Sequence, residues 1–179
     1  MIINGTSLLT MAPIKGMETE KKVAHGTSYG LSEAGYDIRI KQTIIFHPNG
    51  WQMDDPNPCV ASKWRDEDGK QYGKIHAGRF ILASAIEEFQ MPDCLVGVVH
   101  DKSSWARKGL SVFNTVIEPG WKGFLTLELV YHGTDNLLIS AGSGIAQVLF
   151  RQLEVPARYE GKYQNQEDRP VAARDSKEG

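Results

Sequence analysis

The stretch GFLTLELVYH, residues 123–132, alternates two sets of side chains along its whole length. One set is entirely large and apolar or aromatic: Leu125, Leu127, Leu129 and Tyr131. The other set is mixed and contains a single charge: Phe124, Thr126, Glu128 and Val130. Because successive side chains of a β-strand point to opposite faces, this pattern predicts a strand with one face in the core.

Segments on both sides of this stretch also indicate β-structure. Residues 36–46 alternate in the same way, with a break at Gln42, and short apolar runs cover 79–89, 94–100 and 144–153. Gly78 and Pro92 bound the segment 79–89 and favour a strand that turns a corner. Many short strands separated by turns predict an all-β sandwich or barrel-like domain.

The remaining segments lack a strand period. We expect an irregular N-terminal arm with at most one short helix over residues 1–33, a long loop over 52–73 and an aperiodic tail after Pro156. Residues 103–110 predict one or two helical turns, with Ser103 as the N-cap and Gly109 just past the end.

Composition and charge indicate a single globular domain and exclude a general attraction to nucleic acid or membranes. The chain has 179 residues, of which 41% are hydrophobic and 23% charged, and this is typical of one globular domain. A formal charge of -2 gives no general attraction for nucleic acid or for a membrane surface. Cys59 and Cys94 are too few for a structural zinc site and indicate reduced thiols. With no leader or apolar span in the sequence, we expect a soluble, cytoplasmic protein.

Three features suggest chemistry, and each has an ordinary structural alternative. Glu128 is a carboxylate within an apolar strand; if buried, its pKa rises and it becomes a candidate general base, and otherwise it faces solvent. Residues 102–107, KSSWAR, form either an anion site at a helix start or a solvated basic face. Residues 159–174 mix tyrosines, amides and cations, as a nucleotide-binding tail or a disordered terminus would.

Several motifs are missing from the sequence. It has no GxxxxGK[ST] loop and no GxGxxG. No histidine is followed by x-Glu, and the two cysteines cannot form C-x-x-C, so the zinc deaminase motif is also missing. Hydrolysis by this chain would therefore use a carboxylate and water, without zinc.

Five short stretches resemble, in order, the motifs of the trimeric dCTP deaminase and dUTP diphosphatase superfamily, and its deaminase branch more closely. They are AGYDIRI (34–40), KSSWARKGL (102–110), VIEPGWKGFLTLEL (116–129), SGIAQVLF (143–150) and KYQNQ (162–166), the last followed by AAR. The resemblance implies a distorted β-barrel or jelly-roll-like protomer with short helices, assembled as a homotrimer with active sites between subunits. It also implies an arm (1–33), a β domain (34–156) and a tail (157–179) that closes over the nucleotide.

The resemblance further implies hydrolytic deamination of dCTP to dUTP and ammonia. Glu128 would be the general base, while Ser103 and Arg107 would orient the water and help to hold the phosphates. The implied nucleotide contacts are Lys102, Ser104, Asn114, Thr115, Glu118, Trp121, Gln147, Tyr159, Lys162, Tyr163 and Gln166. Mg²⁺ would bind through the phosphates, zinc would not be required, and dTTP is a candidate regulator.

Two alternatives remain open. The short hairpin expected over residues 111–117 is closer to diphosphatase spacing, and it favours a dUTP diphosphatase or a bifunctional enzyme. Lys102 replaces the usual Arg and Glu118 the usual Asp, and these changes fit a nucleotide-binding regulator without catalysis.

Overall fold

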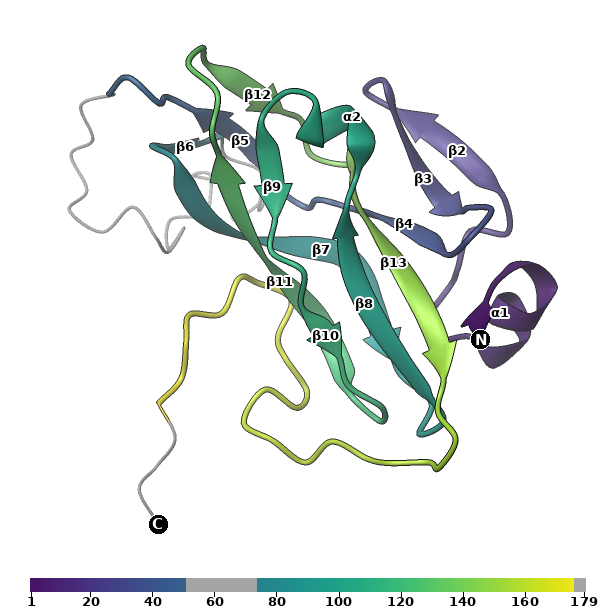
Figure 1. The fold of residues 1–179 in the computed structure, drawn as a ribbon. Helices are drawn as coiled ribbons and strands as arrows, with labels where there is room; N and C mark the ends of the chain where they lie inside the picture. The colour runs from purple at the N-terminus through teal and green to yellow at the C-terminus, as the bar shows by residue number, and fades with distance from the viewer. Residues whose placement is uncertain (51–73, 176–179) are drawn as a thin grey trace, which may run out of the picture.

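Strands account for most of the regular secondary structure in the described residues, as the alternating segments predict (Figure 1). The computed structural model describes residues 1–50 and 74–175, so the loop expected over 52–73 lies outside the described residues. The strands are β1 (Ile2–Ile3), β2 (Lys21–Ala24), β3 (Thr27–Leu31), β4 (Tyr36–Arg39), β5 (Thr43–Phe46), β6 (Lys74–Ala77), β7 (Phe80–Gln90), β8 (Leu95–Asp101), β9 (Leu110–Val112), β10 (Val116–Ile117), β11 (Lys122–Tyr131), β12 (Leu137–Ile139) and β13 (Gly144–Gln152). The helices of the described part are α1 (Gly5–Met11) and α2 (Ser103–Ala106).

The largest sheet has seven strands and carries α2 at one end. Its order is β10-β8-β13-β4-β3-β2, and β1 pairs with β13. Every pairing in it is antiparallel. Figure 1 shows α2 where the chain leaves β8, while α1 lies near the other end of β13.

Two three-stranded sheets complete the fold. Their orders are β7-β11-β9 and β12-β5-β6, and only the β5–β6 pairing is parallel. The prediction of a mostly β protein is therefore confirmed. We expected a sandwich or a distorted, barrel-like or jelly-roll-like domain; the described strands form three separate sheets and do not close into a barrel.

The predicted alternation of β11 is present in the structure. Leu125, Leu127 and Leu129 are buried in the core, while Thr126 and Glu128 on the opposite face are half-buried. The apolar face accordingly contributes to one continuous core with the other sheets. The polar face is left to border a cavity.

Two largely buried polar pairs join the end of β4 and the β4–β5 connection to β7, a strand of another sheet. The Arg39 side chain (β4) donates to Glu87 (β7) over 2.8 Å, and the backbone N–H of Arg39 donates to the same carboxylate over 2.9 Å. Gln42 and Ser84 exchange two buried hydrogen bonds. The polar residue that breaks the alternation of residues 36–46 is therefore satisfied inside the protein.

The prediction of an irregular segment over residues 1–33 was wrong. The segment contains α1, β1, β2 and β3, and β3 pairs with β4 to extend the largest sheet. β2 and β3 have four and five residues, and β2 reads KKVA. Such short strands with charged residues show too little alternation to stand out from a polar loop.

The connection between β9 and β10 also differs from expectation. β9 pairs with β11, whereas β10 pairs with β8. Residues 113–115 therefore cross from one sheet to another and do not form the tip of a hairpin. The start of α2 shifts by one residue as well: Lys102 is the N-cap, and Ser103 is the first helical residue. Gly109 has the positive φ expected there, 84°, but α2 ends earlier than expected, at Ala106 with Arg107 as its C-cap, so Gly109 closes the turn that follows the helix.

In the part of the chain that the structure describes, no helix is long and apolar enough to cross a membrane.

Candidate active site

A pocket of about 640 Å³ opens beside the polar face of β11. One wall comes from β7 and β11, another from the segment 115–121, and a third from the C-terminal segment, which Figure 1 shows returning past β10 and β11. Its lining residues are Phe80, Leu82, Thr115, Val116, Ile117, Glu118, Trp121, Leu125, Thr126, Glu128, Tyr159, Tyr163, Gln166, Val171, Ala172 and Ala173. This volume falls in the range of small-molecule sites, which is about 300–1,000 Å³.

Glu128 is the functional group that stands out in this pocket. Its Oε2 atom is buried and has no hydrogen-bond partner among the described residues. Burial raises the pKa of its carboxyl group above the ordinary value of 4.5, opposed by a hydrogen bond from its own backbone. Leu82 lies directly opposite on β7 and offers no polar group. A carboxylate with a raised pKa and an uncommitted oxygen can accept a proton from water.

The described pocket lining has negative groups but no positive ones. Glu118 and Glu128 are its charged residues, and no Lys, Arg or His belongs to it. Glu118 is exposed, so its carboxylate remains hydrated. An anionic ligand would therefore need cations from outside this lining.

The C-terminal segment docks onto β11 at two points. Gln166 is buried, forms a parallel bridge with Gly123, and accepts a hydrogen bond from the backbone of Phe124 over 3.1 Å. A Cβ atom at Gly123 would lie 2.5 Å from the Gln166 nitrogen, so only glycine permits this approach. At the second point, the Thr126 hydroxyl accepts from the Gln166 side chain (2.5 Å) and from the Val171 backbone (3.0 Å).

Three aromatic residues form a connected wall of the pocket. The Trp121 indole donates to the Tyr163 carbonyl over 2.6 Å, and the Tyr163 backbone donates to the Tyr159 hydroxyl over 3.2 Å. The Tyr159 backbone in turn donates to the carbonyl of Pro119 over 2.8 Å. These bonds fix the tail against the segment that precedes β11, and they leave the aromatic rings available to a planar ligand.

Two exposed cations lie at the outer edge of this wall. The Lys162 ammonium lies 5.3 Å and the Arg174 guanidinium 5.9 Å from the centre of the Tyr163 ring. Arg174 also donates to the Lys162 carbonyl over 2.8 Å and to the Tyr163 hydroxyl over 3.0 Å. The tail therefore places two positive charges next to an aromatic residue of the pocket.

The segment 113–115 has only one residue in the pocket. Thr115 lines it, and the Thr115 carbonyl accepts a hydrogen bond from the Val99 backbone over 3.0 Å. Asn114 is exposed and lies outside the lining.

The α2 residues are separate from the pocket within one chain. Ser103, Ser104 and Arg107 are exposed, and none of them lines the cavity that holds Glu128. Their location at the end of β8 is apart from the C-terminal segment (Figure 1).

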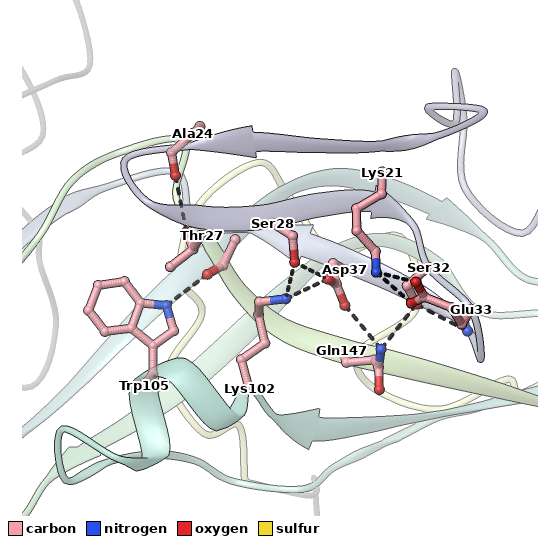
Figure 2. A network of polar contacts seen from close by, with 12 residues as sticks. Lys21, Ala24, Thr27, Ser28, Ser32, Glu33, Asp37, Lys102, Trp105 and Gln147 are labelled. Carbon is pink, nitrogen blue, oxygen red and sulfur yellow. Dashed lines mark hydrogen bonds and ion pairs between the residues drawn. The ribbon is translucent and has the colours of Figure 1, made fainter.

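Lys102 and Gln147 belong to a polar cluster beneath α2. Lys102 forms an ion pair with Asp37 and donates to the Ser28 hydroxyl over 2.8 Å. Gln147 donates to Asp37 over 3.2 Å and to Ser32 over 3.0 Å. Figure 2 shows these side chains converging between β3, β4 and β13. Neither Lys102 nor Gln147 lines the pocket of Glu128.

Reasoning from the sequence missed two residues of these clusters. Thr126 anchors the tail, and its position two residues before Glu128 on the same strand face was the available signal. Asp37 is the centre of the cluster under α2; the sequence placed it in an alternating strand and in the first family-like motif, but gave it no role.

No three His, Cys, Asp or Glu side chains gather into a metal-binding group within residues 1–50 and 74–175. Cys94 is a free, partly buried thiol, and Cys59 lies outside the described residues.

Comparison with known proteins gives consistent matches. A family model described as dCTP deaminase-like matches residues 12–153. The dCTP deaminase of Campylobacter curvus is 38% identical over 155 residues, which cover 83% of each chain. The dCTP deaminase of Helicobacter pylori (strain P12) is 37% identical over 158 residues, which cover 82% of each chain.

Solved structures show the same fold at low sequence identity. The 2'-deoxycytidine 5'-triphosphate deaminase from Agrobacterium tumefaciens aligns with a TM-score of 0.53 and 17% identity, over 85% of this chain and 48% of that one. A mutant dUTPase of phage 80alpha aligns with a TM-score of 0.50 and 15% identity, over 83% of this chain and 94% of that one.

Proposed function

The chain belongs to the dCTP deaminase-like family, and we propose that it catalyses the hydrolytic deamination of dCTP to dUTP and ammonia. One observation carries the proposal: Glu128 lines a pocket of nucleotide size and has a buried carboxylate oxygen without a hydrogen-bond partner among the described residues. A buried polar atom without a partner is costly, and such atoms concentrate where a ligand or water completes the site.

Glu128 is the proposed general base. It takes a proton from water while the water oxygen bonds to C4 of cytosine. One proton of that water finally resides on N3 and the other on the amino group, which leaves as ammonia when the C4–N bond breaks. Glu128 returns to its ionised form, so the atoms balance as dCTP plus water giving dUTP plus ammonia. A positioned base of this kind contributes about 10²–10⁴-fold to the rate.

The pocket wall provides the proposed contacts to the base and sugar. Thr115 and, from its exposed position next to the pocket, Asn114 would meet the pyrimidine edge, while Glu118 would meet the deoxyribose. The aromatic wall of Trp121, Tyr159 and Tyr163 would hold the nucleotide together with Gln166.

The triphosphate requires positive charge that the lining lacks. Lys162 is proposed as one source, because it is exposed beside Tyr163. The exposed Ser103, Ser104 and Arg107 are proposed as the other source, contributed by a neighbouring copy of the chain. This arrangement is a homotrimer with active sites between subunits, and its support is that one chain does not bring α2 to Glu128.

Magnesium is proposed to accompany the nucleotide. Mg²⁺ binds phosphate oxygens, keeps several waters and needs few protein ligands. The exposed carboxylate of Glu118 at the pocket is an oxygen donor of the kind that this ion accepts, directly or through water. When bound, the ion would neutralise part of the phosphate charge. The proposed reaction does not use zinc, because Glu128 activates the water.

A second candidate function is the hydrolysis of dUTP to dUMP and pyrophosphate, alone or together with deamination. The observation that favours it is the short crossing between β9 and β10, residues 113–115, beside the expected base site. A short segment leaves less backbone to distinguish the amino group of cytosine from the carbonyl group of uracil.

A two-substrate product assay tests these functions. Purified protein is incubated with Mg²⁺ and either dCTP or dUTP, and both ammonia and pyrophosphate are measured. We expect ammonia from dCTP in equal amount to dUTP. Pyrophosphate from dUTP without ammonia from dCTP would replace the proposal with the diphosphatase. Tight nucleotide binding without either product would indicate a regulator.

A further inference from the structure

The cluster beneath α2 uses Lys102 as an internal ion-pair partner. Its ammonium group contacts both the Asp37 carboxylate and the Ser28 hydroxyl. The side chain of Lys102 is 11% exposed and that of Asp37 is 3% exposed, so the pair is largely removed from water. The electrostatic attraction between two charges is stronger where water is largely excluded, so this ion pair should be held firmly.

Every oxygen of the Asp37 carboxylate is occupied. Oδ2 accepts from Lys102 and, over 2.8 Å, from the Ser28 hydroxyl, while Oδ1 accepts from Gln147 over 3.2 Å. Gln147 is itself oriented by its bond to Ser32. The carboxylate is therefore held in one orientation by residues from β3, β13 and the start of α2 (Figure 2).

The backbone of Lys102 begins α2. Its carbonyl accepts the backbone N–H groups of Trp105 (3.0 Å) and Ala106 (2.9 Å). A side chain fixed in the sheet thus fixes the first turn of the helix, which has only four residues and little stability of its own.

A second contact fixes the same turn from its other side. The Trp105 indole donates to the Gly144 carbonyl over 2.7 Å. Gly144 packs so tightly that a Cβ atom there would lie 1.8 Å from the Ser28 carbonyl oxygen. Both contacts therefore end at the same place, where β3 meets the beginning of β13.

We propose that Asp37 is a positioning residue: through its ion pair with Lys102 it holds α2 so that Ser103, Ser104 and Arg107 face the active site of a neighbouring copy of the chain. The proposal rests on the proposed function of these α2 residues. It also gives Lys102 a role other than phosphate binding. If the ammonium group moved to a phosphate, Asp37 would remain buried without its cation, which is strongly unfavourable.

Three variants separate positioning from phosphate binding: Asp37→Asn, Lys102→Gln and the double variant. Each single variant leaves one charged group without its partner, whereas the double variant leaves two neutral groups that can hydrogen-bond. We expect kcat for ammonia release to fall about tenfold or more in each single variant, because small displacements at a catalytic site have large effects. KM for dCTP should change less than about twofold, and the double variant should recover most of the lost kcat.

Hydrogen–deuterium exchange of the nucleotide-free protein measures how firmly the first turn of α2 is held. The backbone amides of Trp105, Ala106 and Arg107 should exchange about tenfold faster in Asp37→Asn and return towards the wild-type rate in the double variant. Glu33→Gln is the matched control, because it breaks the exposed Lys21–Glu33 pair in the same neighbourhood. That variant should leave both kcat and the α2 amides unchanged.

Two results would overturn the proposal. One is unchanged α2 exchange in Asp37→Asn. The other is a tenfold rise of KM in both Lys102→Gln and the double variant without recovery of kcat, which would make Lys102 a phosphate ligand. If the wild-type protein released no ammonia from dCTP, the proposed function would fail, while the exchange measurement would still decide whether Asp37 holds α2.

Discussion

Two strand carboxylates of this protein have opposite surroundings. Asp37 on β4 is buried among three donors, Lys102, Ser28 and Gln147. Glu128 on β11 has a buried oxygen with no partner among the described residues, and it borders the pocket. The comparison teaches that burial alone does not indicate a reactive group. What distinguishes the candidate base from a structural carboxylate is the lack of a partner together with access to a cavity.

Glu87 provides a third case that refines the comparison. It is buried as deeply as Asp37 and is paired with Arg39, yet burial still raises the pKa of its carboxyl group above the ordinary value, opposed by the bonds from Arg39. A raised pKa is therefore shared by Glu87 and Glu128. Only Glu128 combines it with the pocket, so geometry and not the pKa selects it.

The largest expected effect comes from removing the proposed base. Glu128→Gln keeps the size of the side chain but cannot take a proton, so we expect kcat for ammonia release to fall about 10²–10⁴-fold. The affinity for dCTP, measured by calorimetry, should stay within about threefold, because the amide still fills the same space.

The matched control for this variant is Glu88→Gln. Glu88 lies on β7, which pairs with β11, but its carboxylate contacts Lys15 and does not line the pocket. It should retain wild-type turnover. If Glu128→Gln released ammonia at the wild-type rate, Glu128 would not be the general base and would be no different in role from the paired carboxylates.

The next largest effect is expected on the free energy of unfolding, when the buried ion pair between Arg39 and Glu87 is broken. Arg39→Met leaves Glu87 buried without its cation, and we expect the free energy of unfolding to fall by about 3–5 kcal/mol at neutral pH. The loss should shrink as the pH approaches 4.5, the ordinary value for this group, because a protonated Glu87 has no charge to bury. Denaturation in urea at several pH values measures this.

An exposed pair supplies the contrast for that measurement. Lys15→Met breaks the Lys15–Glu88 pair, whose side chains are 53% and 37% exposed, and it should cost less than about 1 kcal/mol. Equal losses in the two variants would show that burial of the Arg39–Glu87 pair has no energetic consequence.

The sequence predicts those features of the fold that depend on neighbouring residues. Period two places Glu128 on the face of β11 opposite Leu127 and Leu129, and this is where the structure has it. Gly109 likewise has the positive φ expected of a glycine after the helical turn, although α2 itself ends at Ala106. Both depend on geometry within a few residues.

Features that depend on distant residues could not be predicted in this way. Asp37 meets Lys102 across 65 positions, and Thr126 meets Val171 across 45. The exchange of sheets between β9 and β10 depends on their partners β11 and β8. Local alternation contains no information on which strand lies next to which, so the support of α2 and the anchoring of the tail appear only in three dimensions.

A smaller effect is expected where the tail docks beside Glu128. Thr126→Val removes the hydroxyl that accepts two hydrogen bonds from the tail. Each bond contributes about 0.5–1.5 kcal/mol, so docking should weaken by about 1–3 kcal/mol and proteolytic cleavage within the tail should accelerate about tenfold. KM for dCTP should rise in parallel.

Thr134→Val serves as the control for tail docking, because Thr134 is an exposed loop residue whose hydroxyl contacts no tail residue in the described chain. Proteolysis should be unchanged in this variant. If Thr126→Val were as resistant as the wild type, the bridge at Gly123 and the aromatic wall would be sufficient to hold the tail.

The smallest expected effect concerns stability: it tests whether the ionised, unpartnered carboxylate of Glu128 destabilises the folded protein. Because burial raises the pKa of Glu128 in the folded protein, the folded state binds its proton more tightly than the unfolded chain. This contribution to stability is fully present below pH 4.5 and is lost as the pH rises through the folded-state pKa. At a pH above the folded-state pKa, the ionised Glu128 carboxylate lowers the stability of the folded protein, whereas a neutral glutamine at this position does not.

Glu128→Gln should therefore melt at a higher temperature than the wild type at pH 8 and at nearly the same temperature at pH 4. The side chain is partly reached by water, which reduces the cost, so we expect a difference of about 2–4 °C at pH 8. Calorimetry of the nucleotide-free proteins at both pH values measures it. A variant less stable than the wild type at pH 8 would mean that the ionised carboxylate has a stabilising partner in solution, and Glu128 would then belong with Asp37.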